Sequence, residues 1–416
     1  SPTRELAQQI VKEATALCAF HNIGCVLLVG GTNMNSEANR LKRACEGHSD
    51  IIVATPGRML AHLKETEGFA EQVKGVKVYI MDEADRLLDM GFKRDIDQIT
   101  NFLNKRNAAA LGQRQTLLFS ATLAPTIREI ARQTLLPGYK SIDTVGEEVE
   151  QTHSHVPQRV MCAPLDQQLR VIVQLIEQHQ QQQSAGNFKI ILFFPTARQT
   201  GYYASVLNSV GLPTLEIHSR KSQGHRTKVS EQFRVGKNVI MASSDVSARG
   251  MDYPDVSFVL QVGLTDRDQY IHRLGRTARA GKSGTGLLLL APFEYNYMTQ
   301  KALSDLPLQA VSVEEVLPST PSPFVMRAIS AVRSLAAREK ETPHGEDSER
   351  DGATMSWQAW LGFYNSHCSK LKLSKEELVA KSAEYAATIG LSQIPVLQKK
   401  TIGKMGLQGV PGLRIE

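Results

Sequence analysis

Three carboxylates stand within four residues, at Asp82, Glu83 and Asp85, directly after the apolar run Val78–Met81. Four apolar residues are too few for a helix core and predict a buried strand of a parallel sheet. Open α/β sheets bind ligands at the carboxyl ends of such strands. Acids gathered there repel one another and lose solvation unless a cation compensates them, as a phosphate-bound Mg²⁺ would. An acidic loop without chemistry is an equally good interpretation of this pattern by itself.

Three arginines at i, i+3 and i+6 form a second candidate group, within the segment from Tyr270 to Gly281: Arg273, Arg276 and Arg279. This spacing predicts one face of a helix or of a tight helical turn. Arginine makes bidentate contacts with phosphate, and one supplied by a second domain can stabilise a leaving phosphoryl group. A basic surface helix is the alternative.

Two further groups follow apolar runs. Asp245 and Asp252 flank an Ala-Arg-Gly run, and an acid after a strand can bond a ribose hydroxyl. Ser120 and Thr122 offer two hydroxyls that would lie near the acids at the sheet edge, although this signal is weak alone.

The elements that position these residues repeat along the chain. Apolar runs that end on polar residues or glycine predict strands at 26–29, 51–53, 78–81, 116–119, 190–194, 215–217, 239–241, 258–262 and 287–290. Amphipathic helical stretches alternate with them, which indicates βαβ units and parallel sheets. A stretch without apolar periodicity near Pro137 to Gln151 predicts a linker. Two such halves would form a cleft.

The chain beyond Leu306 predicts helices only. One stripe of apolar residues favours a helix packed in a core over a platform for stacking RNA bases; it comprises Trp357, Trp360, Leu361, Tyr364, Cys368 and Leu371. Ser374 and Glu377 form a capping box. A charged, Gly- and Ser-containing stretch over 339–354 predicts a disordered loop.

Composition restricts the class of protein. The 416 residues carry a net charge of +6, which favours a polyanionic partner. The five cysteines form no C-x-x-C pair, which favours a reduced protein without structural zinc. No apolar run approaches the length of a membrane span. The chain starts at Ser1 within a motif, which predicts a fragment or a processed product.

The ordered motifs P-T-R-E-L-A, G-G, T-P-G-R, D-E-A-D, S-A-T, A-R-G-M-D and H-R-L-G-R-T-A-R resemble those of the DEAD-box RNA helicases over residues 1 to about 306. The resemblance implies two RecA-like α/β domains, the first without its N-terminal part, that close on ATP and single-stranded RNA. The implied organisation is a partial ATP-binding domain at 1–138, a linker at 139–150, a helicase C-terminal domain at 151–306, a helical extension at 307–398 and a Gly-rich basic tail at 399–416.

The resemblance also implies roles for individual residues. Asp82, with Glu83, would hold Mg²⁺ mostly through water, and Glu83 would orient or deprotonate the attacking water. Asp85, Ser120 and Thr122 would couple the nucleotide to domain closure, with His272 facing the acids. Asp252 would contact the ATP ribose, and Arg276 and Arg279 would be arginine fingers that also bind the nucleotide. RNA would be contacted largely through its backbone, independently of sequence; the implied contact residues are Pro2, Thr3, Arg4, Gly30, Gly31, Thr55, Gly57, Arg58, Thr196, Gln223, Arg226, Ser244, Asp245, Arg249 and Gly250.

The helical extension resembles that of fungal and plant mitochondrial DEAD-box proteins that act as intron-splicing RNA chaperones. It implies a mitochondrial, RNA-processing protein, with nuclear, nucleolar and cytoplasmic placement left open. Separately, we expect a monomer. In those relatives the extension packs on the second domain and sharpens RNA bending.

One departure concerns the phosphate-binding loop G-x-x-x-x-G-K-[ST], which this sequence lacks. Gly281-Lys282-Ser283 does not replace it, because Arg276 stands where the loop needs glycine. The leading hypothesis is an ATP-dependent RNA helicase or chaperone whose loop lies upstream of Ser1, so that this chain alone would be inactive. The alternative is a non-catalytic RNA-binding protein, and two α/β domains without a nucleotide are a remote third.

Overall fold

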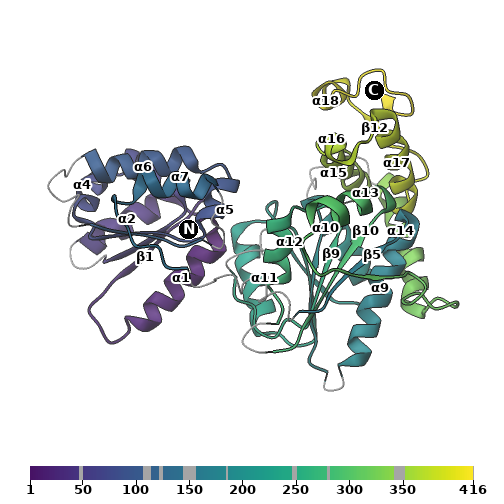
Figure 1. Cartoon of the computed structure of the whole chain (residues 1–416), viewed down its shortest axis with the longest axis horizontal. Coiled ribbons are helices and arrows are strands. Elements are labelled where there is room, and N and C mark those ends of the chain that lie inside the picture. Colours follow the sequence, from purple (N-terminus) through teal and green to yellow (C-terminus); the bar gives the residue numbers. More distant parts are fainter. Residues whose placement is uncertain are drawn as a thin grey trace. The chain divides into compact units, whose positions relative to one another are not determined.

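Parallel strands, each followed by helices, build both parts of the chain. The computed structural model describes residues 1–45, 50–105, 114–120, 125–143, 156–183, 186–245, 251–278, 282–341 and 352–415 (Figure 1). Two units separate within the stretch expected to be a linker, one spanning Ser1–Thr144 and the other Val145–Glu416. None of the helices in these ranges is both long and apolar enough to span a membrane.

The first unit contains two pairs of parallel strands. β1 pairs with β2, and β3 pairs with β4. Helices follow each strand, and the elements are α1 (Arg4–Leu17), β1 (Cys25–Leu28), α2 (Met34–Cys45), β2 (Ile51–Ala54), α3 (Pro56–Glu65), α4 (Phe69–Gln72), β3 (Val78–Met81), α5 (Ala84–Asp89), α6 (Lys93–Lys105), β4 (Gln115–Leu118) and α7 (Pro125–Thr134).

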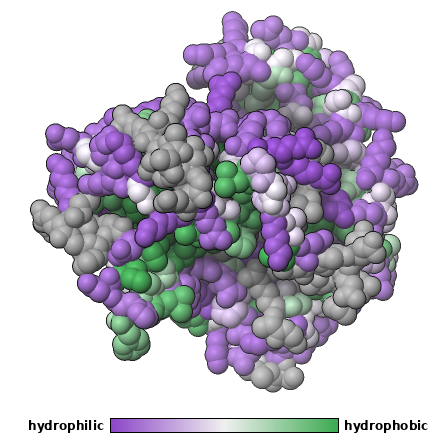
Figure 2. Space-filling model, turned by 60° about the vertical axis from the view of Figure 1, so that its left-hand side comes forward, coloured by the Kyte–Doolittle hydropathy of each residue, from purple (hydrophilic) through white to green (hydrophobic). Residues whose placement is uncertain are grey.

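Strand β3 has the predicted bounds, but the prediction that it is buried is wrong on one face. Met81 is buried, whereas Val78 and Ile80 are about half exposed, as is Phe119 after β4. Successive side chains of a strand point to opposite faces, so one face of β3 packs inward and no described element covers the other. The surface in Figure 2 is correspondingly not uniform, with apolar patches between the hydrophilic side chains.

The second unit holds a seven-stranded, fully parallel sheet in the order β11-β5-β10-β9-β6-β8-β7. Its strands and helices up to the extension are β5 (Gln158–Cys162), α9 (Leu165–Gln182), β6 (Lys189–Phe193), α10 (Ala197–Ser209), β7 (Thr214–Ile217), α11 (Gln223–Val235), β8 (Val239–Ser243), β9 (Phe258–Val262), α12 (Arg267–Leu274), β10 (Thr285–Leu290), α13 (Pro292–Tyr297) and β11 (Gln309–Val311).

Both faces of this sheet are covered. Ile190 and Leu192 of β6 join one buried cluster, and Ile191 and Phe193 join another on the opposite face. The alternation is the period of two expected of a strand, and it explains why β6 reads as a continuous apolar run.

The extension is part of the larger of these two clusters. Its elements are α14 (Pro323–Glu341), α15 (Ala353–Asn365), α16 (Cys368–Leu371), α17 (Lys375–Thr388), β12 (Val396–Leu397), α18 (Lys399–Met405) and β13 (Arg414–Ile415). Helices α14 and α17 pack on α9, and α14 and α15 pack on α10 (Figure 1). The Tyr202 hydroxyl of α10 donates to the Ile389 carbonyl at 3.0 Å. The extension and the sheet therefore share one core.

The aromatic stripe is confirmed as core. Trp357 and Trp360 are at most 2 % exposed, and the indole of Trp357 donates to the Ser382 carbonyl at 3.0 Å. The capping box of Ser374 and Glu377 is confirmed at the start of α17. The loop expected over 339–354 lies mostly outside the described residues.

The stretch 399–415 is folded, so the described part of the expected Gly-rich basic tail is not a tail. Strands β12 and β13 pair in parallel around α18. Ile402 and Leu407 are buried in the same core as the sheet, which holds this segment against the extension.

Candidate active site and nucleic-acid interface

The acidic loop joins β3 to the short helix α5. Glu83 has φ 51° and ψ 53°, the left-handed region that a residue with a side chain occupies at a cost of about 1–3 kcal/mol. Neighbouring backbone holds it there, because Phe119 N–H donates to the Met81 carbonyl at 2.8 Å and Ala84 N–H donates to the Phe119 carbonyl at 2.9 Å. The strained turn thus lies directly between β3 and α5, with the three acids within it or at the first turn of the helix.

Each of two acids caps backbone of the loop. Asp82 Oδ1 accepts the Glu83 N–H at 3.0 Å, and Asp85 Oδ1 accepts the Arg86 N–H at 2.9 Å. No described residue bonds Asp82 Oδ2. Across the described ranges, no cluster of three or more His, Cys, Asp or Glu side chains is arranged to hold a metal. One available carboxylate oxygen fits Mg²⁺, which keeps several waters and takes phosphate oxygens, better than it fits a metal caged by protein.

The hydroxyl group beside the acids is only partly described. The register of β3 and β4 pairs Met81 with Leu118, so Ser120, two residues past β4, lies at the same sheet edge as Asp82 and Glu83. Thr122 lies outside the described residues.

The segment predicted as a helix or a tight helical turn is a helix up to Leu274, where α12 ends, and a turn at Arg276. Arg273 points inward, is 1 % exposed, and donates to Asp245 Oδ1 from Nη2 at 2.6 Å and from Nε at 3.1 Å. Its guanidinium also lies 5.2 Å from the centre of the Phe193 ring. Asp245, expected to contact RNA, is thus engaged in an ion pair that orders this strand end.

Arg276 lies in the turn after α12 and is buried. Its Nε donates to the His272 carbonyl at 3.2 Å, and its Nη1 donates to the Met251 carbonyl. These bonds link the segment bearing His272 to the one bearing Asp252, which is exposed. Arg249, Gly250 and Arg279 lie outside the described residues.

Three RNA-contact segments of the first unit meet at one edge of β1 and β2. The Thr3 hydroxyl caps α1 by accepting the Leu6 N–H at 3.3 Å, and Pro2 precedes it. A Cβ on Gly30 would lie 3.1 Å from Arg4 Nη2, so glycine lets this guanidinium lie close against the turn without shifting. Thr55 N–H, ahead of Gly57, donates to the Leu28 carbonyl at 3.0 Å.

The second unit brings its own candidates to the ends of neighbouring strands. Thr196 follows β6 and caps α10, accepting the Gln199 N–H at 3.1 Å. Ser244 follows β8, and its N–H donates to the Ile217 carbonyl of β7 at 3.3 Å. Gln223 begins α11 after β7, with Arg226 one turn further on and buried. Parallel strands in the order β6-β8-β7 bring these segments to the same edge.

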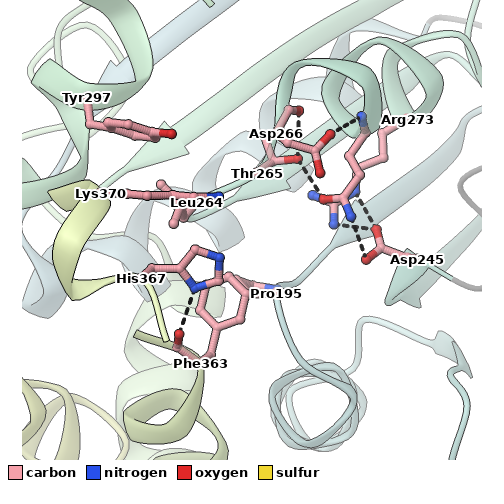
Figure 3. A pocket seen from close by; sticks show the side chains of 11 residues that line it. Pro195, Asp245, Leu264, Thr265, Asp266, Arg273, Tyr297, Phe363, His367 and Lys370 are labelled. Carbon is pink, nitrogen blue, oxygen red and sulfur yellow. Dashed lines mark hydrogen bonds and ion pairs between the residues drawn. The ribbon is translucent and has the colours of Figure 1, made fainter. Parts of the chain in front are cut away.

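A polar pocket of about 190 Å³ lies where this edge meets the extension (Figure 3). Pro195, Thr265 and Arg273 line it from the sheet side, and His367 and Lys370 line it from the end of α15 and from α16. The His367 ring is held by its Nδ1, which lies 2.7 Å from the Phe363 carbonyl. Sequence reasoning missed this contribution because His367 and Lys370 belong to no motif of the first 306 residues.

The extension is also fixed by a buried acid. Tyr364 of α15 donates its hydroxyl to Glu294 Oε1 at 2.5 Å, and Ala291 N–H donates to Glu294 Oε2 at 2.7 Å. Burial raises the pKa of Glu294 to about 7, and the hydrogen bonds from Tyr364 and backbone oppose the shift only in part.

This pKa makes the stability of the second unit depend on pH. The folded protein holds a proton on Glu294 up to about pH 7, whereas an unfolded chain loses it near 4.5. The free energy of unfolding is therefore expected to fall as pH rises between these values and to level off above them. Glu294→Gln should remove this decline, which urea unfolding at several pH values would measure. Parallel pH profiles for the two proteins would contradict the expectation.

Two parallel α/β units with acids, arginines and backbone loops at their strand ends define a nucleotide-driven, RecA-like protein. The sequence profile for the DEAD/DEAH box helicases matches residues 1–130, and that for the helicase conserved C-terminal domain matches residues 167–281. The chain belongs to the DEAD-box ATP-dependent RNA helicase family.

Its relatives extend the match over the whole chain. The sequence is 44 % identical to DEAD-box ATP-dependent RNA helicase 26 of Oryza sativa subsp. japonica, covering 99 % of this chain and 72 % of the relative. It is 42 % identical to DEAD-box ATP-dependent RNA helicase 31 of Arabidopsis thaliana, covering 99 % of this chain and 54 % of that protein. The chain thus spans between about half and three quarters of these two relatives.

A solved structure of Mss116p, with a double deletion of its NTE and C-tail and bound to ssRNA and AMP-PNP, is similar to the chain with a TM-score of 0.81 and 27 % identity. The match covers 100 % of this chain and 80 % of that structure, so it includes the extension.

Proposed function

We propose that the protein is an ATP-dependent RNA helicase that unwinds short duplexes by closing its two domains on ATP and RNA and bending one strand. The observation that carries this proposal is the similarity over the whole chain to a structure bound to ssRNA and AMP-PNP. The motif residues at the strand ends of both units support it.

Each unit has its part in this proposal. Glu83, held in a strained turn, orients or deprotonates the water that attacks the terminal phosphate, and Ser120 and Asp85 sense the nucleotide beside it. Asp82 would hold Mg²⁺, which when bound neutralises charge on the phosphates. Asp252 contacts the ribose. Arg276 with Arg279 would serve as arginine fingers, for which the Arg276 guanidinium must leave the Met251 carbonyl.

In this proposal the protein binds RNA by electrostatic contacts with the phosphate backbone and not with the bases. The affinity for single-stranded RNA is expected to fall with salt at a slope of about −0.7 per phosphate neutralised, on logarithmic axes. We infer that Lys370, an exposed lysine that lines the pocket, contacts one RNA phosphate, so that Lys370→Ala should make the slope shallower by about 0.7. Fluorescence anisotropy with a labelled oligouridylate measures both. Lys399→Ala, an exposed lysine of the extension outside the pocket, is the matched control. A flat salt response of the wild type would contradict the phosphate contacts.

A non-catalytic RNA-binding protein is the second candidate, and it would apply if the whole protein has no G-x-x-x-x-G-K-[ST] loop. Lys282, in the fragment that resembles such a loop, is paired with Asp255. RNA-stimulated phosphate release by the whole protein separates the two functions, since only the helicase shows it.

We also propose that the extension makes the protein an RNA chaperone in mitochondria, a role that rests on the extension's resemblance to intron-splicing relatives. Two measurements test this role. Splicing of mitochondrial introns should fall in cells depleted of the protein, and a fluorescent fusion of the protein should be located in mitochondria.

A further inference from the structure

Glu37 of α2 is a fully buried carboxylate in the first unit, and none of the helicase motifs includes it. Its Oε1 accepts the Val29 N–H at 3.3 Å and lies 2.5 Å from the Thr32 hydroxyl. Its Oε2 lies 3.2 Å from Arg58 Nη1 and 2.9 Å from His62 Nε2. A buried carboxylate is tolerated only where donors and a cation compensate its lost hydration, and these four partners do so.

The partners belong to the loop after β1 and to helix α3 after β2. Val29 and Thr32 flank the Gly30-Gly31 turn after β1, where Gly31 has φ +83°. Arg58 lies in the first turn of α3 (Pro56–Glu65), next to Thr55, Pro56 and Gly57 after β2, whereas His62 lies in the last turn of the same helix. Glu37 therefore bonds simultaneously to the two loops that carry the predicted RNA contacts of this strand edge.

Arg58 bonds both to Glu37 and to the loop after β1. Its Nη2 donates to the Thr32 carbonyl at 3.0 Å while its Nη1 faces Glu37, and its side chain is only 13 % exposed. The guanidinium fork is thus occupied by the protein itself. Its planar geometry allows these two bonds at once, which a lysine ammonium on a flexible stem does not reproduce.

His62, the remaining partner of Glu37, is itself held by a second hydrogen bond. His62 is fully buried, and its Nδ1 lies 2.8 Å from the Thr66 hydroxyl just past the end of α3. Because this ring is fixed at both nitrogens, the position of Glu37 relative to α3 is fixed as well.

We propose that Glu37 is a positioning residue for RNA binding, which sets the distance between the Gly30-Gly31 and Thr55–Arg58 loops so that they meet neighbouring phosphates of one strand. In this arrangement Arg58 holds the two loops at a fixed distance by bonding to Glu37 and to the Thr32 carbonyl. The inference rests on the RNA-binding function proposed above and identifies what orders that surface.

Glu37→Gln tests the proposal. A glutamine has one acceptor oxygen and an NH₂ group, so in either orientation it turns donors toward donors at one pair of partners. The RNA concentration that gives half-maximal ATP hydrolysis is expected to rise roughly tenfold, the effect of losing a hydrogen bond to a charged group. The rate at saturating RNA should stay unchanged. Anisotropy with a labelled oligouridylate and a non-hydrolysable ATP analogue, on the whole protein, should show the same loss of affinity.

Arg58→Lys provides a second variant, at a residue less buried than Glu37, in case Glu37→Gln does not fold. It keeps the positive charge but loses the fork, and we expect a similar loss of RNA affinity. The double variant should be no weaker than the weaker single variant, because both act through one connection. Glu71→Gln, the same substitution on exposed α4, is the matched control.

The possible results distinguish the positioning role of Glu37 from the RNA-binding function on which it rests. Wild-type RNA affinity in Glu37→Gln or in Arg58→Lys would overturn the positioning role, as would a lower maximal rate with an unchanged half-saturating RNA concentration, which marks mere loss of folded protein. Failure of the wild type itself to bind RNA would instead overturn the proposed function.

Discussion

Glu83→Gln is expected to abolish ATP turnover in the whole protein while RNA binding is retained. Glutamine has nearly the same shape as glutamate but cannot accept a proton from the attacking water. Loss of a general base typically lowers the rate by about 10²–10⁴-fold. Release of phosphate in the presence of saturating RNA measures the first effect, and anisotropy with labelled RNA measures the second.

The control for this experiment is Glu71→Gln, which removes an exposed carboxylate of the same unit and should leave hydrolysis intact. Retained ATPase activity in Glu83→Gln would exclude the role given to Glu83. Joint loss of hydrolysis and RNA binding would show instead that the strained turn, with its φ of 51°, had collapsed.

Trp357→Ala is expected to destabilise the second unit by about 3–5 kcal/mol, as deletion of a buried tryptophan does. The side chain is fully buried and its indole N–H is bonded to the Ser382 carbonyl, so truncation leaves a cavity and removes a hydrogen bond between α15 and α17. Urea unfolding followed by far-UV circular dichroism measures the change. Because the sheet and the extension share a core, the whole unit should unfold in the same shifted transition.

Met326→Ala is the control for Trp357→Ala, since Met326 is an exposed apolar residue of α14 and its truncation should change stability little. Loss of the extension alone at low urea, with the sheet still folded, would contradict a shared core.

The periodicity of the sequence predicted strands well, and β3 and β9 have the expected bounds. The periodicity did not predict short strands or strands that contain polar residues. Strand β5 contains Gln158 and Arg159, and β11 is only three residues long. The order of strands in the sheet follows from packing among distant segments, which local periodicity does not encode. The same limit explains the segment 399–416, where Ile402 and Leu407 are isolated apolar residues whose burial depends on distant helices.

In the candidate site, residue types were easier to predict than orientations. The spacing of Arg273 and Arg276 suggested one face, yet the helix ends between them and Arg273 turns to Asp245. Partnerships over long separations left no local signal: 25 residues separate Glu37 from His62, and 70 separate Tyr364 from Glu294.

The bond from Tyr202 to Ile389 joins residues 187 positions apart, across the border between the sheet and the extension. Substitutions on either side of that border should therefore not be independent in their effects. Because α10 and the extension also share buried side chains, a change on α10 that is neutral with one extension is expected to be less well tolerated with another. The two segments are expected to have been inherited, and to have changed, together.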